Sequence, residues 1–223
     1  MVDQSRVSTV RNSVEIIAFV SVVVADAMGL VPITQTIFLV PLIWILLRLR
    51  NERWSTIGFH KPESLKQAIV LGVLAGLLLE VFAVFVTTPG ISALFGVEPD
   101  YTELKAVQGN LKLLLVFLCF SWVIAAFGEE ICFRGFLMKR MAQVFGEGRT
   151  AWIASLLLSS ALFGWGHTEQ GISGWSQEGL SGLWLGILFL ATKRNLAVPI
   201  VAHGVSNTLA FVLIYLGRYP GLG

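Results

Sequence analysis

Long apolar stretches, each close to the length of one membrane crossing, constrain this chain more than any other feature. A helix needs about 20 mostly apolar residues to cross the hydrocarbon core of a bilayer. Such stretches lie near residues 14–31, 33–50, 67–88, 111–128 and onward, 150–167, 178–192 and 196–216. They predict an all-α, polytopic transmembrane helical bundle of about seven to eight spans, which forms a single integral membrane domain over residues 1–223.

The composition supports a membrane environment and excludes one class of partner. Hydrophobic residues make up 55% of the chain and charged residues only 13%, and the mean hydropathy is +0.76. These values exceed what a soluble domain needs to build a core. The net charge of +2 leaves no basic surface large enough for nucleic acid. We therefore expect the lipid bilayer to be the immediate partner and no nucleic acid to bind.

The basic residues predict the orientation in the membrane. Ten of them crowd three connections between the apolar stretches: Arg48, Arg50, Arg53, Lys61, Lys66, Lys139, Arg140, Arg149, Lys193 and Arg194. By the positive-inside rule these connections are cytoplasmic, and so is the amino terminus. The segment 89–110, which carries Glu98, Asp100 and Glu103, then lies outside. Because no organelle signal is evident, we expect a prokaryotic cytoplasmic membrane.

Three short patterns place ionisable and polar groups inside this apolar sequence. The residues that define them are Glu129, Glu130 and Arg134, then Phe163 and His167, then His203 and Asn207. Lipid-embedded sequence rarely carries such groups, because an unsatisfied polar group in hydrocarbon costs several kcal/mol. Their presence on three successive stretches predicts a membrane-embedded polar cavity.

The first pattern divides its two adjacent glutamates between different tasks. Neighbouring residues on a helix point about 100° apart, whereas residues four apart lie on one face. Glu130 and Arg134 therefore have the spacing of an intrahelical ion pair, which leaves Glu129 to face a cavity. The alternative is that these charges form the polar end of a span that meets the cytoplasm.

The predicted hairpin brings the first two patterns to one level. A turn at 146–148 lies midway between Glu129 and His167, so two antiparallel helices would place both residues roughly 28 Å from it at 1.5 Å per residue. His203 and Asn207 share a third helix face at a similar depth. Each histidine alone could instead be a helix-end residue or an interhelical hydrogen-bond partner. Thr168, Glu169 and Gln170 are candidates for the cavity lining.

Several chemistries are open to this group. A desolvated carboxylate near imidazoles can activate water, and an imidazole with a carboxamide can stabilise an oxyanion, which together describe amide hydrolysis. The same donors, Glu129, His167 and His203, could instead hold zinc with an open position for water. A third alternative is a proton or cation pathway, for which Asp26 and Glu80 would be further intramembrane carboxylates.

Other enzyme classes lack their usual residues. Serine-hydrolase and nucleotide-binding signatures are absent from the sequence, so we expect neither a nucleotide nor an organic cofactor. His60 lies in a basic connection and is expected at the surface. Cys119 and Cys132 are poorly placed to bridge on one helix, which makes them packing residues rather than catalytic thiols.

In this order and on successive spans, the three patterns resemble the signature of the CPBP family of intramembrane proteases, also called the Abi or CAAX-protease family. The resemblance covers residues 110–216, which would form the catalytic core. It implies that Glu129 and His167 activate the attacking water, that His203 and Asn207 stabilise the oxyanion, and that Glu130, Arg134 and Phe163 support them.

The resemblance implies a peptide or membrane-associated protein as substrate, and the best-known members act on lipidated ones. It leaves open whether the water is activated by glutamate alone or with zinc. We expect an endopeptidase whose cavity opens to the cytoplasm. The principal rival is a membrane regulator or bacteriocin-immunity protein that keeps the fold without the chemistry. A transporter is a second rival, which would need Asp26 and Glu80 to matter as much as the motif residues.

Overall fold

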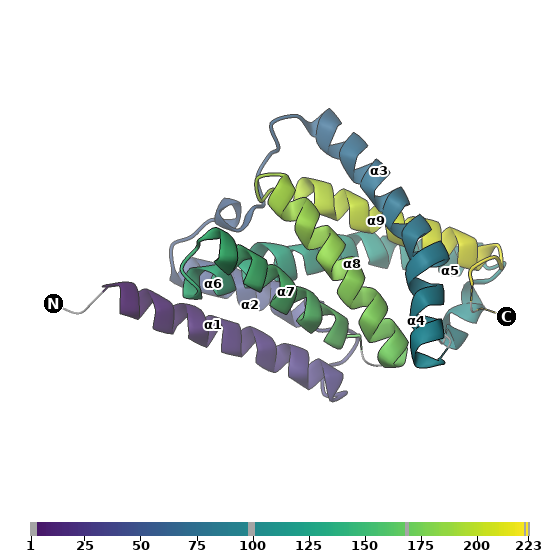
Figure 1. Ribbon diagram of the computed structural model, residues 1–223, viewed down its shortest axis with the longest axis horizontal. Coiled ribbons are helices and arrows are strands. Elements are labelled where there is room, and N and C mark those ends of the chain that lie inside the picture. Colours follow the sequence, from purple (N-terminus) through teal and green to yellow (C-terminus); the bar gives the residue numbers. More distant parts are fainter. Residues whose placement is uncertain (1–3, 98–100, 168–169, 221, 223) are drawn as a thin grey trace.

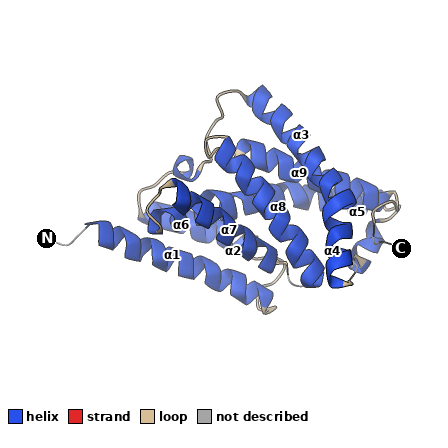
Figure 2. Cartoon of the chain, viewed as in Figure 1, coloured by secondary structure: helices blue, strands red, loops and turns tan. Residues whose placement is uncertain are grey.

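The computed structural model describes residues 4–97, 101–167, 170–220 and 222, and every regular element in these ranges is a helix (Figure 2). The elements in chain order are α1 (Gln4–Ala27), α2 (Thr36–Leu49), η1 (Trp54–Ile57), α3 (Leu65–Phe82), η2 (Ala83–Thr87), α4 (Thr88–Phe95), η3 (Thr102–Val107), α5 (Leu111–Phe120), η4 (Ser121–Leu137), α6 (Met138–Val144), α7 (Arg149–Trp165), α8 (Gly171–Ala191) and α9 (Ala197–Tyr215). The η2 and η4 segments are π-helical, and η1 and η3 are 3-10 helices. The predicted all-α class is confirmed.

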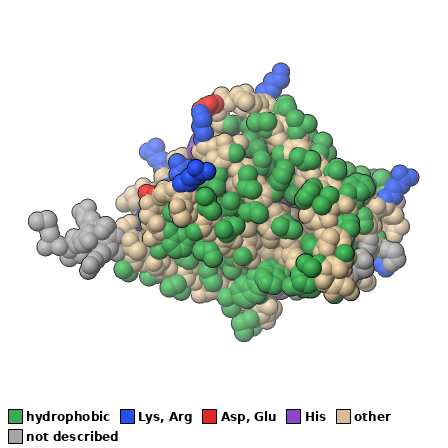
Figure 3. All heavy atoms as spheres, viewed as in Figure 1, with side chains coloured by type: hydrophobic (Ala, Val, Ile, Leu, Met, Phe, Trp, Pro, Cys, Tyr) green, Lys and Arg blue, Asp and Glu red, His purple; other side chains and the backbone are tan. Residues whose placement is uncertain are grey.

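Within the described ranges, four helical stretches are long and apolar enough to cross a membrane. They are Val7–Ala27, Leu65–Phe95, Leu111–Val144 and Ala197–Tyr215. The surface agrees with this assignment, since hydrophobic side chains cover most of the face shown in Figure 3 and the charged ones gather at its margins. Soluble proteins rarely expose contiguous apolar surface of this extent. The protein is therefore an integral membrane protein.

The arrangement of the helices is a tilted bundle with α1 and the α3–α4 stretch on opposite margins (Figure 1). The largest buried cluster packs η4 against α1, α2 and α7, and its aromatic centre includes Phe19, Phe133, Phe136 and Phe163. Elsewhere α3 packs closely on α9 because Gly72 and Gly76 lack side chains that would collide with α9. Small residues at such a crossing are typical of helix pairs in membranes.

The predicted turn between the two motif-bearing helices is confirmed. Residues 145–148 separate α6 from α7, and the backbone there takes positive φ at Gly146 (98°) and Glu147 (58°). Glycine adopts such values without steric cost. On α6, before this turn, the buried guanidinium of Arg140 pairs with Glu15 at 2.7 Å and with Glu52 at 2.9 Å. These ion pairs tie α1 and the connection after α2 to α6.

Two features of the helices differ from expectation. The third apolar helix does not stop at residue 88 but continues through α4 to Phe95. Pro89 lacks an N–H and its ring crowds the preceding turn, and the π-helical η2 directly before α4 absorbs the mismatch. Glu98 and Asp100 of the predicted outer segment lie outside the described residues.

The second difference is η4. A regular α-helix was expected over the first motif, and a π-helix is found instead.

The two cysteines differ in burial. Cys132 is buried and Cys119 is exposed, and both are unbridged thiols.

Candidate active site

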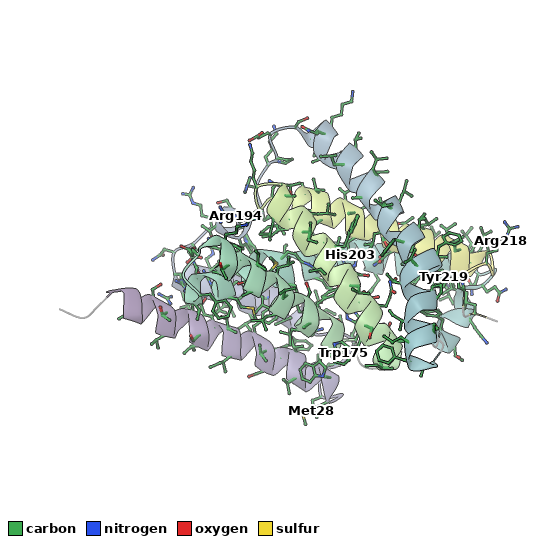
Figure 4. The ribbon with its side chains drawn as sticks, in the orientation of Figure 1. Met28, Trp175, Arg194, His203, Arg218 and Tyr219 are labelled. Atoms are coloured by element: carbon green, nitrogen blue, oxygen red, sulfur yellow. The ribbon has the colours of Figure 1, made fainter. Side chains whose placement is uncertain are left out.

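Four of the predicted site residues line one cavity of about 230 Å³. Glu129 reaches it from η4, His167 from the residues that follow α7, and His203 and Asn207 from α9. Figure 4 shows His203 in the interior of the bundle. The structure therefore brings together the residues from all three sequence patterns that were expected to share a site.

Glu130 does not face this cavity but holds its walls together. Its Oε1 accepts a hydrogen bond of 2.8 Å from Nη1 of Arg134, and the two side chains are 0% and 2% exposed. This is the intrahelical pair that the spacing predicted. The same oxygen lies 2.9 Å from Nδ1 of His203, so the carboxylate of Glu130 links η4 to α9. Sequence spacing gave no sign of this second partner.

The hydrogen bonds of the two histidines specify which nitrogen of each ring carries a proton. Nδ1 of His167 lies 2.8 Å from the carbonyl oxygen of Phe163, and a carbonyl can only accept, so Nδ1 is the donor. Nδ1 of His203 donates to the carboxylate of Glu130 in the same way. In its neutral form each ring then carries its lone pair on Nε2.

Phe163 lies at the centre of the supporting residues. Its ring is 4.4 Å from Cζ of Arg134, in cation–π geometry, and its centroid is 4.9 Å from that of His167 and 6.4 Å from that of His203. One side chain thus packs against both imidazoles and the buried guanidinium. Its loss would loosen all three at once.

A glycine lets α9 approach η4 at the level of the site. A Cβ on Gly204 would lie 2.5 Å from the ring of Trp122, which is closer than real Cβ contacts. The indole nitrogen of Trp122 in turn donates a hydrogen bond of 3.1 Å to Thr208. Gly204 is therefore required for the close packing that positions its neighbour His203.

The donors that could hold zinc fit only in part. Histidine ligands commonly have their second nitrogen held by a carboxylate or a carbonyl, and both His167 and His203 satisfy this. Among the described residues, however, no three His, Cys, Asp or Glu side chains are grouped as a metal ion requires. The donors as placed do not form a zinc site, so coordination by Glu129, His167 and His203 stays a prediction.

The cavity extends beyond the predicted residues, toward one end of the bundle. Its lining includes Glu80 on α3, Glu178 on α8, Tyr101 before η3 and Tyr219 after α9. The last two belong to connections at the end opposite the basic turns, and Figure 4 shows this separation between Tyr219 and Arg194. The expectation that the cavity opens toward the basic, cytoplasmic end is thus at odds with its lining.

The remaining candidates lie at or near the cavity. Gln170 is in the lining, whereas Thr168 and Glu169 lie outside the described residues. Asp26, at the end of α1, interacts electrostatically with His167 but is not among the described residues of the lining. His60 is exposed as expected, and its ring lies 3.1 Å from Nδ2 of Asn195.

Comparison with known proteins identifies part of the chain. Residues 111–209 match the family model described as type II CAAX prenyl endopeptidase Rce1-like. All three motifs fall in this segment, and the match confirms the resemblance to the CAAX-protease family. No curated protein and no solved structure matches the chain.

Proposed function

We propose that this protein is an intramembrane endopeptidase. The proposal rests on the match of residues 111–209 to a protease family and on the cavity that these residues help to line. The observation that carries the proposal is the convergence of Glu129, His167, His203 and Asn207 on one cavity. These groups supply a base and hydrogen-bond donors, the two requirements of peptide hydrolysis.

The attacking water is activated by Glu129 and His167. Both present acceptors to the cavity, since the hydrogen bond to Phe163 places the lone pair of neutral His167 on Nε2. They draw a proton from the water as it adds to the substrate carbonyl. The group that takes this proton then delivers it to the leaving amine.

The oxyanion of the tetrahedral intermediate is stabilised by His203 and Asn207, one helical turn apart on α9. Because Nδ1 of His203 already donates to Glu130, a second donation from Nε2 requires the imidazolium form. Glu130 provides the counter-charge to that imidazolium, and Arg134 holds Glu130 in place. The amide group of Asn207 donates from the side chain without any change of charge.

The substrate is a peptide or a membrane-associated protein cleaved at membrane depth. We propose that all seven apolar stretches predicted from the sequence lie in the bilayer, and that the basic turns and the amino terminus are cytoplasmic. A substrate then reaches the cavity from the opposite side of the membrane or laterally from the lipid. A lipid group on the substrate would add membrane affinity but is not needed by the chemistry.

The test compares protein termini in membranes from cells that carry the wild type or Glu129→Gln at matched expression. Glutamine keeps the size and hydrogen bonding of the side chain but removes the base. New termini that need the intact glutamate support proteolysis. Identical termini, together with rescue of a deletion phenotype by Glu129→Gln, would instead support a regulator that acts by binding.

A further inference from the structure

The end of the cavity beyond His203 and Asn207 holds a cluster of polar side chains that take no part in the proposed hydrolysis. Its members are Glu80, Glu178, Tyr101 and Tyr219, together with Ser206. Figure 4 places Tyr219 farther toward the carboxy-terminal end of the molecule than His203. The chemistry of these side chains specifies what can bind there.

Glu80 is a deeply buried carboxyl group with one unused oxygen. Only 5% of the residue is exposed. Its Oε2 accepts a hydrogen bond of 2.7 Å from the hydroxyl of Ser206, and the hydroxyl of Tyr219 lies within hydrogen-bonding reach of the same carboxyl. Its Oε1 is buried and lacks any hydrogen-bond partner among the described residues. A buried acceptor left unpaired costs about 1–3 kcal/mol, so this oxygen is suited to a donor that arrives with the ligand.

The charge of the cavity favours a cationic donor. Glu80, Glu129 and Glu178 all line it, and Glu178 is close enough to Glu80 to interact with it electrostatically. The described lining contains neither lysine nor arginine. Carboxylates gathered in a low-dielectric site whose described lining lacks lysine and arginine attract a positive group.

Two aromatic rings complete the cluster. Tyr101 and Tyr219 pack edge to face, with their centroids 5.1 Å apart. Burial raises the pKa of Tyr101 to about 12, so this side chain remains a neutral phenol. The faces of neutral aromatic rings attract ammonium and guanidinium groups through cation–π interactions.

The cluster lies close to the reacting bond. Ser206, which holds Glu80, is next to Asn207 and three residues after His203 on α9. Three residues of helix correspond to about 4.5 Å along the axis, whereas an extended peptide advances about 3.3 Å per residue. A group bound at Glu80 therefore belongs to a substrate residue within about two positions of the scissile bond.

We propose that Glu80, Glu178, Tyr101 and Tyr219 form a subsite for a substrate cation, either a lysine or arginine side chain or a free amino terminus. The subsite rests on the proposed protease function and defines its substrate class as peptides with a positive charge beside the cleaved bond. A side chain as the source of charge means internal cleavage, as in the proposed endopeptidase, whereas an amino terminus as the source means cleavage within about two residues of that terminus.

Specificity profiling tests this subsite with purified full-length protein in lipid nanodiscs. Wild type, Glu80→Gln and Glu63→Gln are each given a proteome-derived peptide library, half of it acetylated at the amino termini. We expect lysine or arginine, or an unacetylated terminus, to favour cleavage about tenfold at one position, since charge-assisted hydrogen bonds are the stronger ones. The preference should disappear in Glu80→Gln and persist in Glu63→Gln, whose carboxylate is 82% exposed on the basic side. The acetylated half distinguishes the two sources of charge.

A binding measurement decides the point without cleavage. In the Glu129→Gln background, n-butylammonium should raise the unfolding temperature saturably, whereas n-butanol should not, and adding Glu80→Gln should remove the effect. If Glu80→Gln does not fold, Glu178→Gln replaces it, with the same expected loss. Cleavage without charge preference, with no saturable effect of n-butylammonium, would overturn the proposed subsite but not the proposed protease function. An absence of cleavage would overturn the protease function, and the n-butylammonium result alone would then decide whether the subsite exists.

Discussion

The carboxylate of Glu130 lies 2.9 Å from Nδ1 of His203, a residue 73 positions away in the chain. This contact joins the π-helical segment to α9 and fixes the tautomer of one histidine. Because the same oxygen also accepts from Arg134, three ionisable groups from two elements form one buried unit. The unit is almost inaccessible to solvent, and with His203 neutral the charges of Arg134 and Glu130 balance one another.

Arg134→Ala should destabilise the protein by about 3–5 kcal/mol, because removal of one partner leaves a buried charge uncompensated. Thermal unfolding in detergent measures the effect, with Arg149→Ala as the control, since Arg149 is an exposed arginine at the start of α7. The double variant Glu130→Gln/Arg134→Met removes both charges and keeps an acceptor for His203, so it should recover most of the loss. Equal stability of Arg134→Ala and the control would refute the buried pair.

Asn207→Ala should lower kcat by about 10²-fold or more if the carboxamide donates to the oxyanion. KM should change much less, since the contact strengthens only in the transition state. Single-turnover rates per folded molecule measure this, with Asn110→Ala as the control because Asn110 caps α5 outside the cavity. A rate equal to wild type would reduce Asn207 to an interhelical contact.

Glu52 provides a test of the ion pairs at the basic end. Burial alone would raise its pKa, but the hydrogen bond and charge of Arg140, with the charges of Arg50 and Lys139, outweigh burial and lower the pKa below its ordinary value. A lowered pKa in the folded state means that the ionised carboxylate stabilises that state. This contribution is complete above the unfolded value of about 4.3 and is lost as the pH falls through the folded pKa.

The melting temperature of Glu52→Gln should therefore lie below that of wild type at pH 7, and the difference should shrink as the pH falls below about 4. Glu63→Gln is the matched control. Glu63 pairs with Lys193 at 2.7 Å, but both side chains are exposed, and such pairs contribute little. A difference for Glu52→Gln that stays constant to low pH would contradict its role in the ion pairs.

Sequence patterns predicted the helices far better than the contacts between them. Apolar length located the helical stretches, and the i,i+4 spacing found the Glu130–Arg134 pair, because both depend on neighbours in the chain. The partnership of Glu130 with His203 depends on how α9 crosses η4, which Gly204 permits and no local pattern encodes. Tyr101 and Tyr219 were missed for the same reason, since they reach the cavity from connections at either end of the sequence segment that carries the motifs.

The last prediction concerns zinc. Peptidase activity should survive treatment with 1,10-phenanthroline, because no three His, Cys, Asp or Glu side chains in the described ranges are grouped as a metal ion requires, and because zinc bound by Glu129 would compete with its role as base. Activity before and after chelation, with the metal content of the purified protein, measures this. Loss of activity that zinc restores, at one equivalent per chain, would instead establish a zinc enzyme, with Glu129, His167 and His203 as the candidate ligands. Glu129→Gln should then also lower the bound zinc, a change that the glutamate-activated mechanism does not predict.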